Sequence, residues 1–451
     1  MGKPIKVLLL DFCSEKNRGD AAMQVGLLKL VFRYIADPIV SIISVFGANQ
    51  STYLLSEYDH SATYPVTILG GLKPTFYPLG DSTNDSIFLI ELKQAIYFCL
   101  SLILLFLLFL KIPKRIIIKV LPKAFHDSLE QFRNTDLVIW NGRNFRSRGN
   151  PLIELFRTIN IVYHPLVCIA LSKPIACVGA SVWHLNNPLS RSILKWVFNN
   201  CFFLSLREES SYIEVTALLG KKSKTQTVQL PDLSFAVFKD GESVKAKRLP
   251  LSNNEFPKII GLTIVDWKDD GKASRKNYGE EITSIIKYFI KKGSKIVIIP
   301  QVTKKWESND LVVSEIMNIQ GAKENISVFK GNPTIYDLFA IYSKLDFLVA
   351  TRMHSAIFAS FVGTPLIAIP YDKGGKWNII RELGYKDQII EYSDLAESRL
   401  QEMIQQCWTD KDSILRIVDS NLHRCSELVD QNIIQMLDGS PINDLVTINK
   451  S

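Results

Sequence analysis

Residues 346–370 read DFLVATRMHSAIFASFVGTPLIAIP, and this stretch decides the fold class. The run DFLVA is apolar enough to be a central strand, and SAIFASF then shows the spacing of apolar residues typical of a helix. A second strand-like run, PLIAIP, follows the helix. A strand, a helix and a strand in this order form a βαβ unit, so the stretch predicts a parallel sheet covered by helices.

The same alternation extends outward from this stretch. Strand-like and helical runs alternate from IKVLLLD near the N-terminus to CFFLSLRE, and again from KIIGLTIVD onward. We therefore expect an α/β fold of two Rossmann-like parallel-sheet domains facing a cleft, which resembles the glycosyltransferase type B fold. The expected parts are an N-terminal domain at 1–237, a polar linker at 238–257, a C-terminal domain at 258–393, and helices with a frayed tail at 394–451.

Composition places the chain among globular proteins. Of its 451 residues, 47% are hydrophobic and 22% are charged, which excludes disordered, collagenous and low-complexity classes. The seven cysteines form no CxxC pair or zinc-like cluster, and the N-terminal run lacks a signal-peptide cleavage site, so a reducing compartment is favoured. The net charge of +8 favours anionic partners, but no nucleic-acid module is visible and nucleic acid is not expected.

One segment departs from a soluble composition. Residues 94–110, QAIYFCLSLILLFLLFL, carry no charge, and the basic run KIPKRIIIKVLPKAF follows. A single membrane crossing would place strands at 5–11 and 136–140 on opposite sides, although both are expected in one sheet. We predict that an insert at about 86–125 dips into one leaflet and lays its basic part on anionic head groups, where each basic residue contributes roughly 1 kcal/mol. A buried helix, a dimerisation helix and a true span are the alternatives.

The turn between strand and helix in the opening stretch carries the most informative polar side chains. Thr351, Arg352 and His354 fall at the N-terminus of the predicted helix, where free backbone N–H groups bind anions. Arg352 matches a phosphate or carboxylate, and His354 can transfer a proton, although a lone histidine in such a place is often structural. Lys373, in the following PYDKGGKW run, either reaches the same rim or is solvated.

Two other turns occupy comparable places in the alternating pattern. In SEKNRGDAA, Gly19 lets the backbone approach a ligand, while Asp20 either lines the site or caps the helix. In SLREES, Arg207 closes a strand and either points into the crevice at the carboxyl ends of the strands or pairs with an acid. Asp232 ends another short strand and either reaches that crevice or serves as a cap. Neither GxGxxG nor a P-loop motif is present, so dinucleotide and P-loop binding are not supported.

Taken in order, these motifs resemble those of the polysaccharide pyruvyl transferase family. NRGDAA is similar to its Asn-x-Gly-Asp motif, SLREESSYIEV to its Ser-Leu-Arg-Asp helix start, and LPDLSF to its Pro-Asp strand. TRMHSAIFASFVGTPLIAIPYDKGGKW is similar to its Arg-x-His-Ser block and the Tyr-Asp-x-Lys segment after it. The resemblance covers nearly the whole chain apart from the apolar insert and the last helices.

The resemblance implies transfer of pyruvate from phosphoenolpyruvate to two hydroxyls of a sugar in a cell-surface polysaccharide precursor, with formation of a cyclic ketal. It makes the C-terminal domain the donor side and the N-terminal domain the acceptor side. Phosphoenolpyruvate is then a co-substrate, and neither a metal nor another cofactor is expected. The residues implied to bind the donor are Arg207, Thr351, Arg352, His354, Ser355 and Lys373, of which Arg207, Arg352 and His354 are also the catalytic candidates. Those implied to bind the acceptor or line the cleft are Asn17, Gly19, Asp20, Asn144, His184 and Asp232.

The expected partners follow from the same resemblance and from the apolar insert. They are phosphoenolpyruvate, a lipid-linked oligosaccharide or polysaccharide acceptor, and an anionic membrane surface, and a homo-oligomer stays open. The expected location is the cytoplasmic face of the inner membrane, with peripheral or monotopic attachment.

One motif departs from the family pattern. Family members carry a Gly-Gly-Gly-Asn run after the strand that ends near Trp140, often with an acid close behind, whereas here residues 141–146 read NGRNFR. This leaves the base for the sugar hydroxyl open among Asp20, His184 and Asp232. A nucleotide-sugar-dependent glycosyltransferase of the same fold and a non-catalytic scaffold of polysaccharide assembly are the alternative functions.

Overall fold

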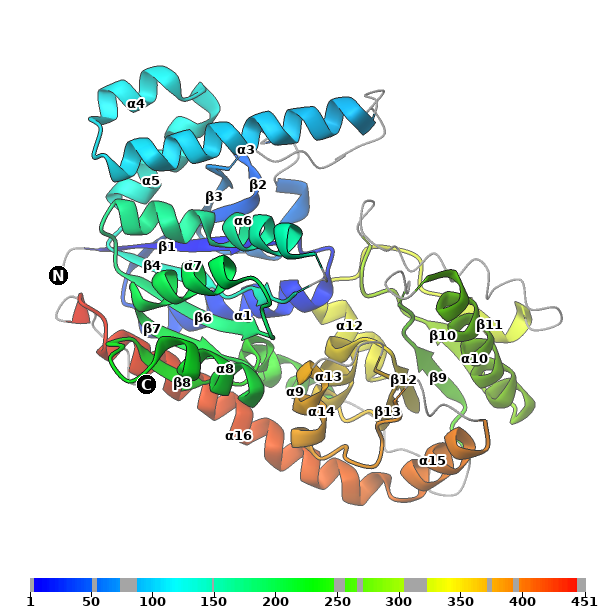
Figure 1. Ribbon diagram of the computed structural model, residues 1–451. Coiled ribbons are helices and arrows are strands. Elements are labelled where there is room, and N and C mark those ends of the chain that lie inside the picture. Colours follow the sequence, from blue (N-terminus) through cyan, green and yellow to red (C-terminus); the bar gives the residue numbers. More distant parts are fainter. Residues whose placement is uncertain are drawn as a thin grey trace. The chain divides into compact units, whose positions relative to one another are not determined.

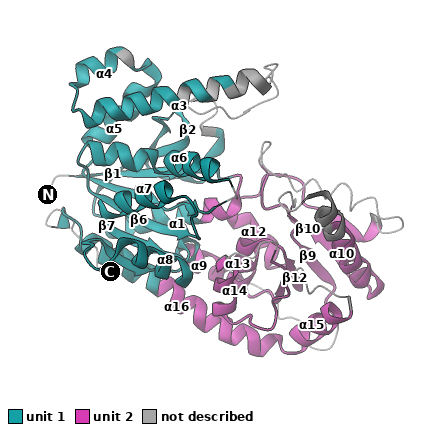
Figure 2. Ribbon diagram, in the orientation of Figure 1, with its two compact units in different colours: residues 1–15, 23–236, 428–451 teal, residues 16–22, 237–427 magenta. Residues whose placement is uncertain are grey.

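The protein folds as two compact α/β units. The computed structural model in Figure 1 describes residues 4–50, 55–73, 87–147, 150–246, 256–265, 271–303, 323–370, 375–391 and 397–443. Figure 2 colours the units separately: unit 1 comprises residues 1–15, 23–236 and 428–451, and unit 2 comprises residues 16–22 and 237–427. Both contain a parallel sheet, as the alternating sequence pattern predicts.

Unit 1 contains a parallel sheet of eight strands in the order β3-β2-β1-β4-β6-β7-β8, with β5 paired to β6. Strand β1 pairs with β2 on one side and β4 on the other, and nearly all of its residues are buried. Burial on both faces explains why its sequence is a continuous apolar run rather than an alternating one. The strands are β1 (Ile5–Phe12), β2 (Pro38–Gly47), β3 (Val66–Gly71), β4 (Leu137–Asn141), β5 (Asn144–Phe145), β6 (Ile175–Val182), β7 (Cys201–Leu206) and β8 (Gln226–Gln229).

Helices of unit 1 pack on this sheet through one large apolar core. Trp140 of β4, Phe132 of α5 and Phe198 of α7 are fully buried in the same cluster. The helices are α1 (Arg18–Tyr34), whose first residues group with unit 2, α3 (Ile87–Phe109), α4 (Lys114–Val120), α5 (His126–Asn134), α6 (Pro151–Ala170), α7 (Pro188–Asn199) and α8 (Glu209–Leu219).

Unit 2 contains a five-stranded parallel sheet in the order β11-β10-β9-β12-β13. The run predicted as a central strand forms β12 between β9 and β13, and all four of its residues are buried. The strands are β9 (Ile259–Leu262), β10 (Lys295–Ile298), β11 (Ile326–Val328), β12 (Phe347–Ala350) and β13 (Leu366–Ala368). The helices are α9 (Phe238–Lys245), α10 (Gly271–Lys291), α12 (Ile335–Tyr342), α13 (Met353–Phe361), α14 (Asn378–Leu383), α15 (Glu397–Thr409) and α16 (Lys411–Asp438).

The predicted linker at 238–257 is wrong in its first part, which forms helix α9. Phe238 is fully buried against Phe361 of α13, and Gly241 also lies on Phe361. Packing of these two residues outweighs the polar composition on which the linker assignment rested.

The C-terminal helix α16 contributes to both units, up to Glu427 in unit 2 and from Leu428 in unit 1. In unit 2 its Asp419 binds Lys245 of α9. In unit 1 its Asp430 accepts a hydrogen bond from Arg33 of α1 at 2.9 Å.

The apolar insert forms α3 and α4. Helix α3 buries Ser101, Leu104, Leu105 and Leu108, which stand at positions i, i+3, i+4 and i+7 and form one stripe. By length and composition α6 is apolar enough to cross a membrane, but half of it is buried, as in a core helix of a soluble protein; 98–109 is a shorter apolar helix.

Two glycine substitutions test the packing of α9. A Cβ atom at Gly241 would lie 2.6 Å from Cβ of Phe361, whereas one at Gly279 of α10 would meet none of the described atoms within 4 Å. We expect Gly241→Ala to lower the free energy of unfolding by about 1–3 kcal/mol through overpacking. Gly279→Ala should raise it by up to about 1 kcal/mol through helix propensity. Chemical denaturation measures both, and equal effects would show that α9 is not packed on α13.

Candidate functional site

In unit 2 the chain turns from β12 into α13 just where the sequence predicts a strand-to-helix turn. Arg352 occupies the N-cap position of α13, with extended backbone angles of φ −114° and ψ 126°. His354 lies two residues further, in the first helical turn, where the Ser355 N–H donates to the Arg352 carbonyl at 3.0 Å. The turn therefore carries a cation and an imidazole at the positive end of a helix.

Thr351 and Ser355, both predicted to bind the donor, are fully buried. The Thr351 hydroxyl donates to the Thr263 carbonyl at 2.7 Å, and the Thr351 N–H donates to Thr263 Oγ1 at 3.0 Å. Ser355 donates from its hydroxyl to the Arg352 carbonyl at 2.6 Å. These two side chains hold the turn in shape, and we assign them to positioning rather than to ligand contact.

The imidazole of His354 lies against the backbone of Gly19, in the first turn of α1. A Cβ atom at residue 19 would lie 2.2 Å from His354 Nδ1, closer than any side chain allows. Gly19 groups with unit 2, to which residues 16–22 belong. The first turns of α1 and α13 therefore meet at His354, and both helix N-termini carry partial positive charge.

Arg18, at the start of α1, belongs to unit 2 and is hydrogen-bonded to other residues of that unit, a role that the sequence patterns did not reveal. It is 1% exposed, and its guanidinium donates to Asn332 Oδ1 and, at 3.4 Å, to Thr303 Oγ1. Its backbone N–H donates to the Gln301 carbonyl at 3.1 Å, and the Thr303 N–H donates to the Lys16 carbonyl at 3.0 Å. The sequence motif draws attention to Gly19 and Asp20, and it gives no signal that the arginine before them is buried.

The residue that caps α1 is Asn17 and not Asp20. Asn17 immediately precedes the helix, and its Oδ1 accepts a hydrogen bond from the Gly19 N–H at 3.2 Å. Asp20 lies in the first turn, partly exposed, where a negative charge is favoured by the helix dipole. Of the two roles predicted for Asp20, the capping role therefore belongs to Asn17, and the site-lining role stays a prediction.

In unit 1 the guanidinium of Arg207, just after β7, lies in a polar network. Its Nη1 donates to Asp232 Oδ2 at 3.1 Å, and its Nη2 donates to Ser181 Oγ at 2.8 Å and to Asn144 Oδ1. The side chains of Arg207 and Asp232 are 9% and 1% exposed. Of the two predictions for Arg207, pairing with an acid is observed: Asp232 is the nearer acid, and Glu208 Oε1 lies 4.0 Å from Arg207 Nε.

The altered loop at 141–146 places its arginines on neighbouring side chains. Arg143 donates to Cys13 Sγ, and the Arg146 guanidinium lies 5.8 Å from the centre of the Trp183 ring. His184, the next residue, is exposed in the segment after β6. Of the predicted acceptor residues in unit 1, the structure brings Asn144 and Asp232 together through Arg207 and shows no contact of His184 with them.

A buried pair that the sequence did not suggest lies at the carboxyl end of β1. Asp11 adopts a left-handed backbone (φ 60°), and its Oδ1 lies 2.6 Å from His164 Nδ1 of α6. Its Oδ2 accepts from Trp140 Nε1 at 2.8 Å, and His164 Nε2 accepts from the Leu72 N–H at 3.1 Å. Because Nε2 is an acceptor, the ring proton is on Nδ1 and is donated to Asp11. An aspartate at the end of an apolar strand is a sequence signal that could have singled out Asp11, but no signal of that kind points to His164.

The pKa values of Asp11 and of the nearby Lys73 are both lowered, the first against the effect of burial and the second because of it. Burial alone would raise the pKa of Asp11, but His164, Arg143 and Lys73 together lower it below its ordinary value. Burial lowers the pKa of Lys73 to about 8, against the opposing effect of Asp11. Asp11 is therefore held as a carboxylate.

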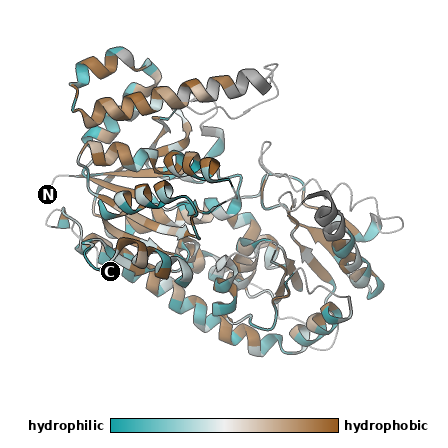
Figure 3. Cartoon of the chain, in the orientation of Figure 1, coloured by the Kyte–Doolittle hydropathy of each residue, from teal (hydrophilic) through white to brown (hydrophobic). Residues whose placement is uncertain are grey.

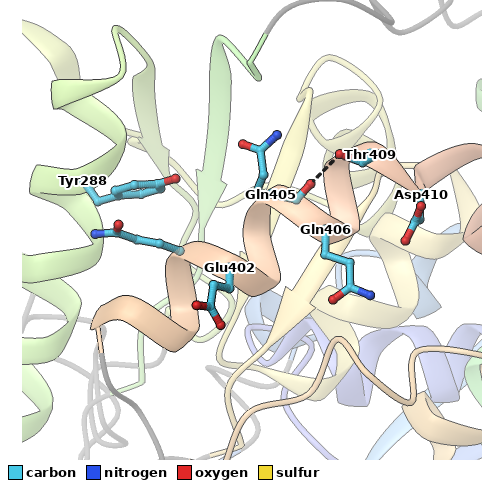
Figure 4. Close-up of a pocket in the computed structure, with 7 residues that line it drawn as sticks. Tyr288, Glu402, Gln405, Gln406, Thr409 and Asp410 are labelled. Carbon is cyan, nitrogen blue, oxygen red and sulfur yellow. Dashed lines mark hydrogen bonds between the residues drawn. The ribbon is translucent and has the colours of Figure 1, made fainter.

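Lys373, the remaining predicted donor residue, lies outside the described residues. Within the described part of the chain, no group of three or more His, Cys, Asp or Glu side chains is placed to hold a metal ion. Unit 2 also has an open cavity of about 510 Å³. Figure 4 shows it lined by Tyr288 of α10 and by polar residues of α15, and none of the predicted site residues lines it.

Comparison with known proteins places these residues in a family. The model of the family described as polysaccharide pyruvyl transferase matches residues 17–373. The chain belongs to the polysaccharide pyruvyl transferase family. The match begins at Asn17 and ends at Lys373, so every predicted site residue of this pyruvyl transferase family member lies within it. The chain is also 21% identical over 412 residues to the amylovoran biosynthesis protein AmsJ of Erwinia amylovora, covering 88% of this chain and 90% of that protein.

Solved structures show which fold this family member has. UDP-GlcNAc 2-epimerase of Neisseria meningitidis bound to UDP-GlcNAc is similar with a TM-score of 0.57 and 13% identity, over 96% of this chain and 99% of that one. MnaA of S. aureus with UDP is similar with a TM-score of 0.54 and 12% identity, over 98% of each chain. HepE of Anabaena with UDP and glucose gives 0.52 and 12%, over 96% and 99%. The fold is thus that of the glycosyltransferase type B class, as the sequence predicts.

A double-mutant cycle tests the contact between Gly19 and His354. We expect Gly19→Ala to lower the free energy of unfolding by about 1–3 kcal/mol, because the new Cβ displaces the imidazole. In a His354→Ala background the same substitution should cost far less, because the ring is gone. Denaturant unfolding of the four proteins measures the coupling. An equal cost of Gly19→Ala in both backgrounds contradicts the contact.

Removal of the imidazole partner of Asp11 should destabilise unit 1. We expect His164→Ala to lower the free energy of unfolding at neutral pH by about 3 kcal/mol, because a buried carboxylate loses its partner. The lowered pKa of Asp11 in the folded protein means that the pair stabilises fully above the ordinary value of 3.8 and loses this effect as pH falls through the folded value. The difference from wild type should therefore shrink in acid.

The exposed His184 provides the control for this measurement. His184→Ala should change the free energy of unfolding by less than about 0.5 kcal/mol. A cost of His164→Ala that is the same at neutral pH and in acid would show that Asp11 is not held ionised by this pair.

Proposed function

We propose that this protein transfers pyruvate from phosphoenolpyruvate to two hydroxyls of one sugar in a cell-surface polysaccharide precursor, forming a cyclic ketal. Membership of the polysaccharide pyruvyl transferase family and similarity to an amylovoran biosynthesis protein support the modification of a polysaccharide. The observation that carries the proposal is the meeting of Arg352, His354 and two helix N-termini in unit 2.

This part of unit 2 suits a small ligand with two anionic groups. Phosphoenolpyruvate carries a phosphate and a carboxylate, and a helix N-terminus offers free N–H groups to such groups. The guanidinium of Arg352 supplies a fixed positive charge at the same turn, with the planar geometry that matches either anion. In the proposed complex Arg352 and the two helix starts hold the donor, while Thr351 and Ser355 keep the turn in place.

The reaction needs one proton delivered to the donor and two removed from the sugar. The first hydroxyl oxygen loses its proton to a base and bonds to C2 of phosphoenolpyruvate while C3 gains a proton, for which His354 is the donor we propose. The bond from C2 to the phosphate oxygen then breaks, and phosphate leaves with its electron pair. The second hydroxyl oxygen bonds to C2 and loses its proton, which closes the ketal. Arg352 stabilises the departing phosphate.

Among the three candidates for the base, the contacts favour Asp20. The carboxylate of Asp232 is bound to Arg207, and His184 is exposed without a described contact to the other predicted residues. Asp20 is partly exposed and adjoins Gly19, the residue on which His354 packs. In unit 1 we propose that Arg207, with Asp232 and Asn144 fixing its orientation, binds a charged group of a substrate.

We propose a lipid-linked acceptor and a location at the cytoplasmic face of the inner membrane. The apolar helix α3 and the basic run after it support attachment to an anionic surface. An enzyme held there reaches a lipid-linked sugar by diffusion in two dimensions.

Calorimetric titration tests the donor. We expect phosphoenolpyruvate to bind the wild-type protein, and Arg352→Ala to weaken binding at least roughly tenfold, because a charge-assisted hydrogen bond contributes about 1.5–3 kcal/mol. Arg381→Ala is the matched control: Arg381 lies on α14 of the same unit and binds Glu391 at the surface at 2.9 Å. This control should bind phosphoenolpyruvate like wild type.

The same titration with UDP-hexoses separates the alternatives. Binding of a UDP-hexose in place of phosphoenolpyruvate would identify a nucleotide-sugar glycosyltransferase of the same fold. Binding of neither ligand, with the fold intact, would favour a scaffold and would contradict the proposed chemistry.

A further inference from the structure

Exposed large apolar side chains gather on one group of helices in unit 1. Among the described residues they concentrate on α3, the turn after it, α4, α6 and α7, and Figure 3 shows α3 and α6 largely in the hydrophobic colours. We call the following residues the apolar face: Leu92, Ile96, Leu100, Leu102, Ile103, Phe106, Phe109, Leu110, Ile116, Leu152, Ile153, Phe156, Leu189 and Trp196. Phe106 is 61% exposed and Leu152 is 75% exposed, so most of the surface of each side chain lies outside the core. A patch of this kind marks an interaction surface.

Ring contacts join the helices of the apolar face into one surface. The rings of Phe98 on α3 and Phe156 on α6 lie 4.5 Å apart between centroids. Those of Phe109 on α3 and Trp196 on α7 lie 5.9 Å apart. The N-terminal ends of α6 and α7 are also joined, because Asn187 donates to the Pro151 carbonyl at 2.9 Å.

Helix α3 is fixed to the fold and does not leave it to cross a bilayer. Its stripe of Leu104, Leu105 and Leu108 lies in the core cluster of unit 1. The hydroxyl of Tyr163 on α6 donates to the Ser101 carbonyl at 3.0 Å, in a buried place. The exposed side of α3 can therefore meet apolar surroundings only while the other side stays packed on the protein.

Basic residues accompany the apolar face. Between residues 92 and 126 the sequence has no Asp or Glu and six Lys or Arg residues. Five of these, Lys111, Lys114, Arg115, Lys119 and Lys123, are exposed in and around α4, and Lys114 is paired with Glu130 of α5. Exposed Lys195 stands beside Trp196 on α7, and tryptophan is enriched where membrane meets water.

We propose that the apolar face is a monotopic membrane-docking surface, which sinks into one leaflet of an anionic bilayer while the basic residues lie on its head groups. Apolar side chains with flanking cations are the combination that such a surface requires. A second copy of this chain is disfavoured as the occupant, because a two-fold interface would place the same basic patch against itself. The surface thus extends beyond the apolar insert to α6 and α7. These two helices are separate from the insert in the sequence, and only the fold brings them next to it.

The biological purpose of this surface rests on the proposed function, since docking would bring the protein to a lipid-linked acceptor. Membrane binding itself is measured without donor or acceptor, so a failure of docking and a failure of pyruvyl transfer are distinguishable. Protein that binds phosphoenolpyruvate but not vesicles would overturn only the docking proposal.

A fluorescent label at Cys99 reports on α3 in the full-length protein. Cys99 is the exposed one of the seven cysteines, and the other six are buried. With an environment-sensitive dye on Cys99, we expect a blue shift and higher intensity on addition of vesicles of phosphatidylethanolamine and phosphatidylglycerol. Quenchers attached to the lipid acyl chains should then reduce the signal. Vesicles of phosphatidylcholine alone should give a much weaker response, because they lack the anionic lipid.

Paired variants separate docking from general surface hydrophobicity. Ile103→Gln/Phe106→Gln/Leu152→Gln removes three exposed side chains from two helices of the apolar face, and should weaken co-sedimentation with anionic vesicles at least roughly tenfold. Ile213→Gln is the control: Ile213 is 59% exposed on α8, outside the apolar face, and should leave co-sedimentation unchanged. Thermal unfolding checks that both variants are folded.

Two results would overturn the proposal. The first is vesicle binding that the triple variant leaves intact. The second is a dimer of the labelled protein in solution that dissociates in the triple variant and does not bind vesicles, which would make the apolar face an interface between copies of this chain.

Discussion

The close contact between the His354 imidazole and the backbone of Gly19 is the constraint on which the unit 2 site depends. It requires that residue 19 has no side chain, and it brings the first turn of α1 to the first turn of α13. Arg18, buried beside Gly19 and bonded to Asn332 and Thr303, keeps the start of α1 there. Two helix N-termini then act on one small region, which attracts an anion more strongly than either would alone.

Buried charges in unit 1 are paired at the carboxyl edge of the sheet. Asp232 binds Arg207, and Asp11 binds His164 and Trp140. Such pairs are costly to bury and add little net stability, but they fix the orientation of the side chains that take part. Their position at the strand ends, where ligands bind in parallel α/β sheets, is consistent with that use. The need of buried charges for partners therefore determines which side chains lie together at this edge of the sheet.

Helix α3 shows how one segment serves two environments. Its buried stripe joins the core of unit 1, and its remaining faces stay apolar although they are exposed. A helix that is apolar on all sides normally lies fully inside a protein or a membrane. In this chain one side of α3 is packed on protein, and we propose that lipid covers the other side.

The sequence by itself determined the α/β class, the central strand β12 with its following helix, the family, and the presence of an apolar and basic insert. These features rest on local periodicity and short motifs, which are written in consecutive residues. Tertiary structure decided the rest: helix α9 in the expected linker, Asn17 rather than Asp20 as the cap, the burial of Thr351 and Ser355, and the pair of Asp11 with His164. Asp11 and His164 are far apart in the chain, and the sequence carries no signal for their meeting, because contacts of that kind depend on which strand ends and helix faces the fold brings side by side.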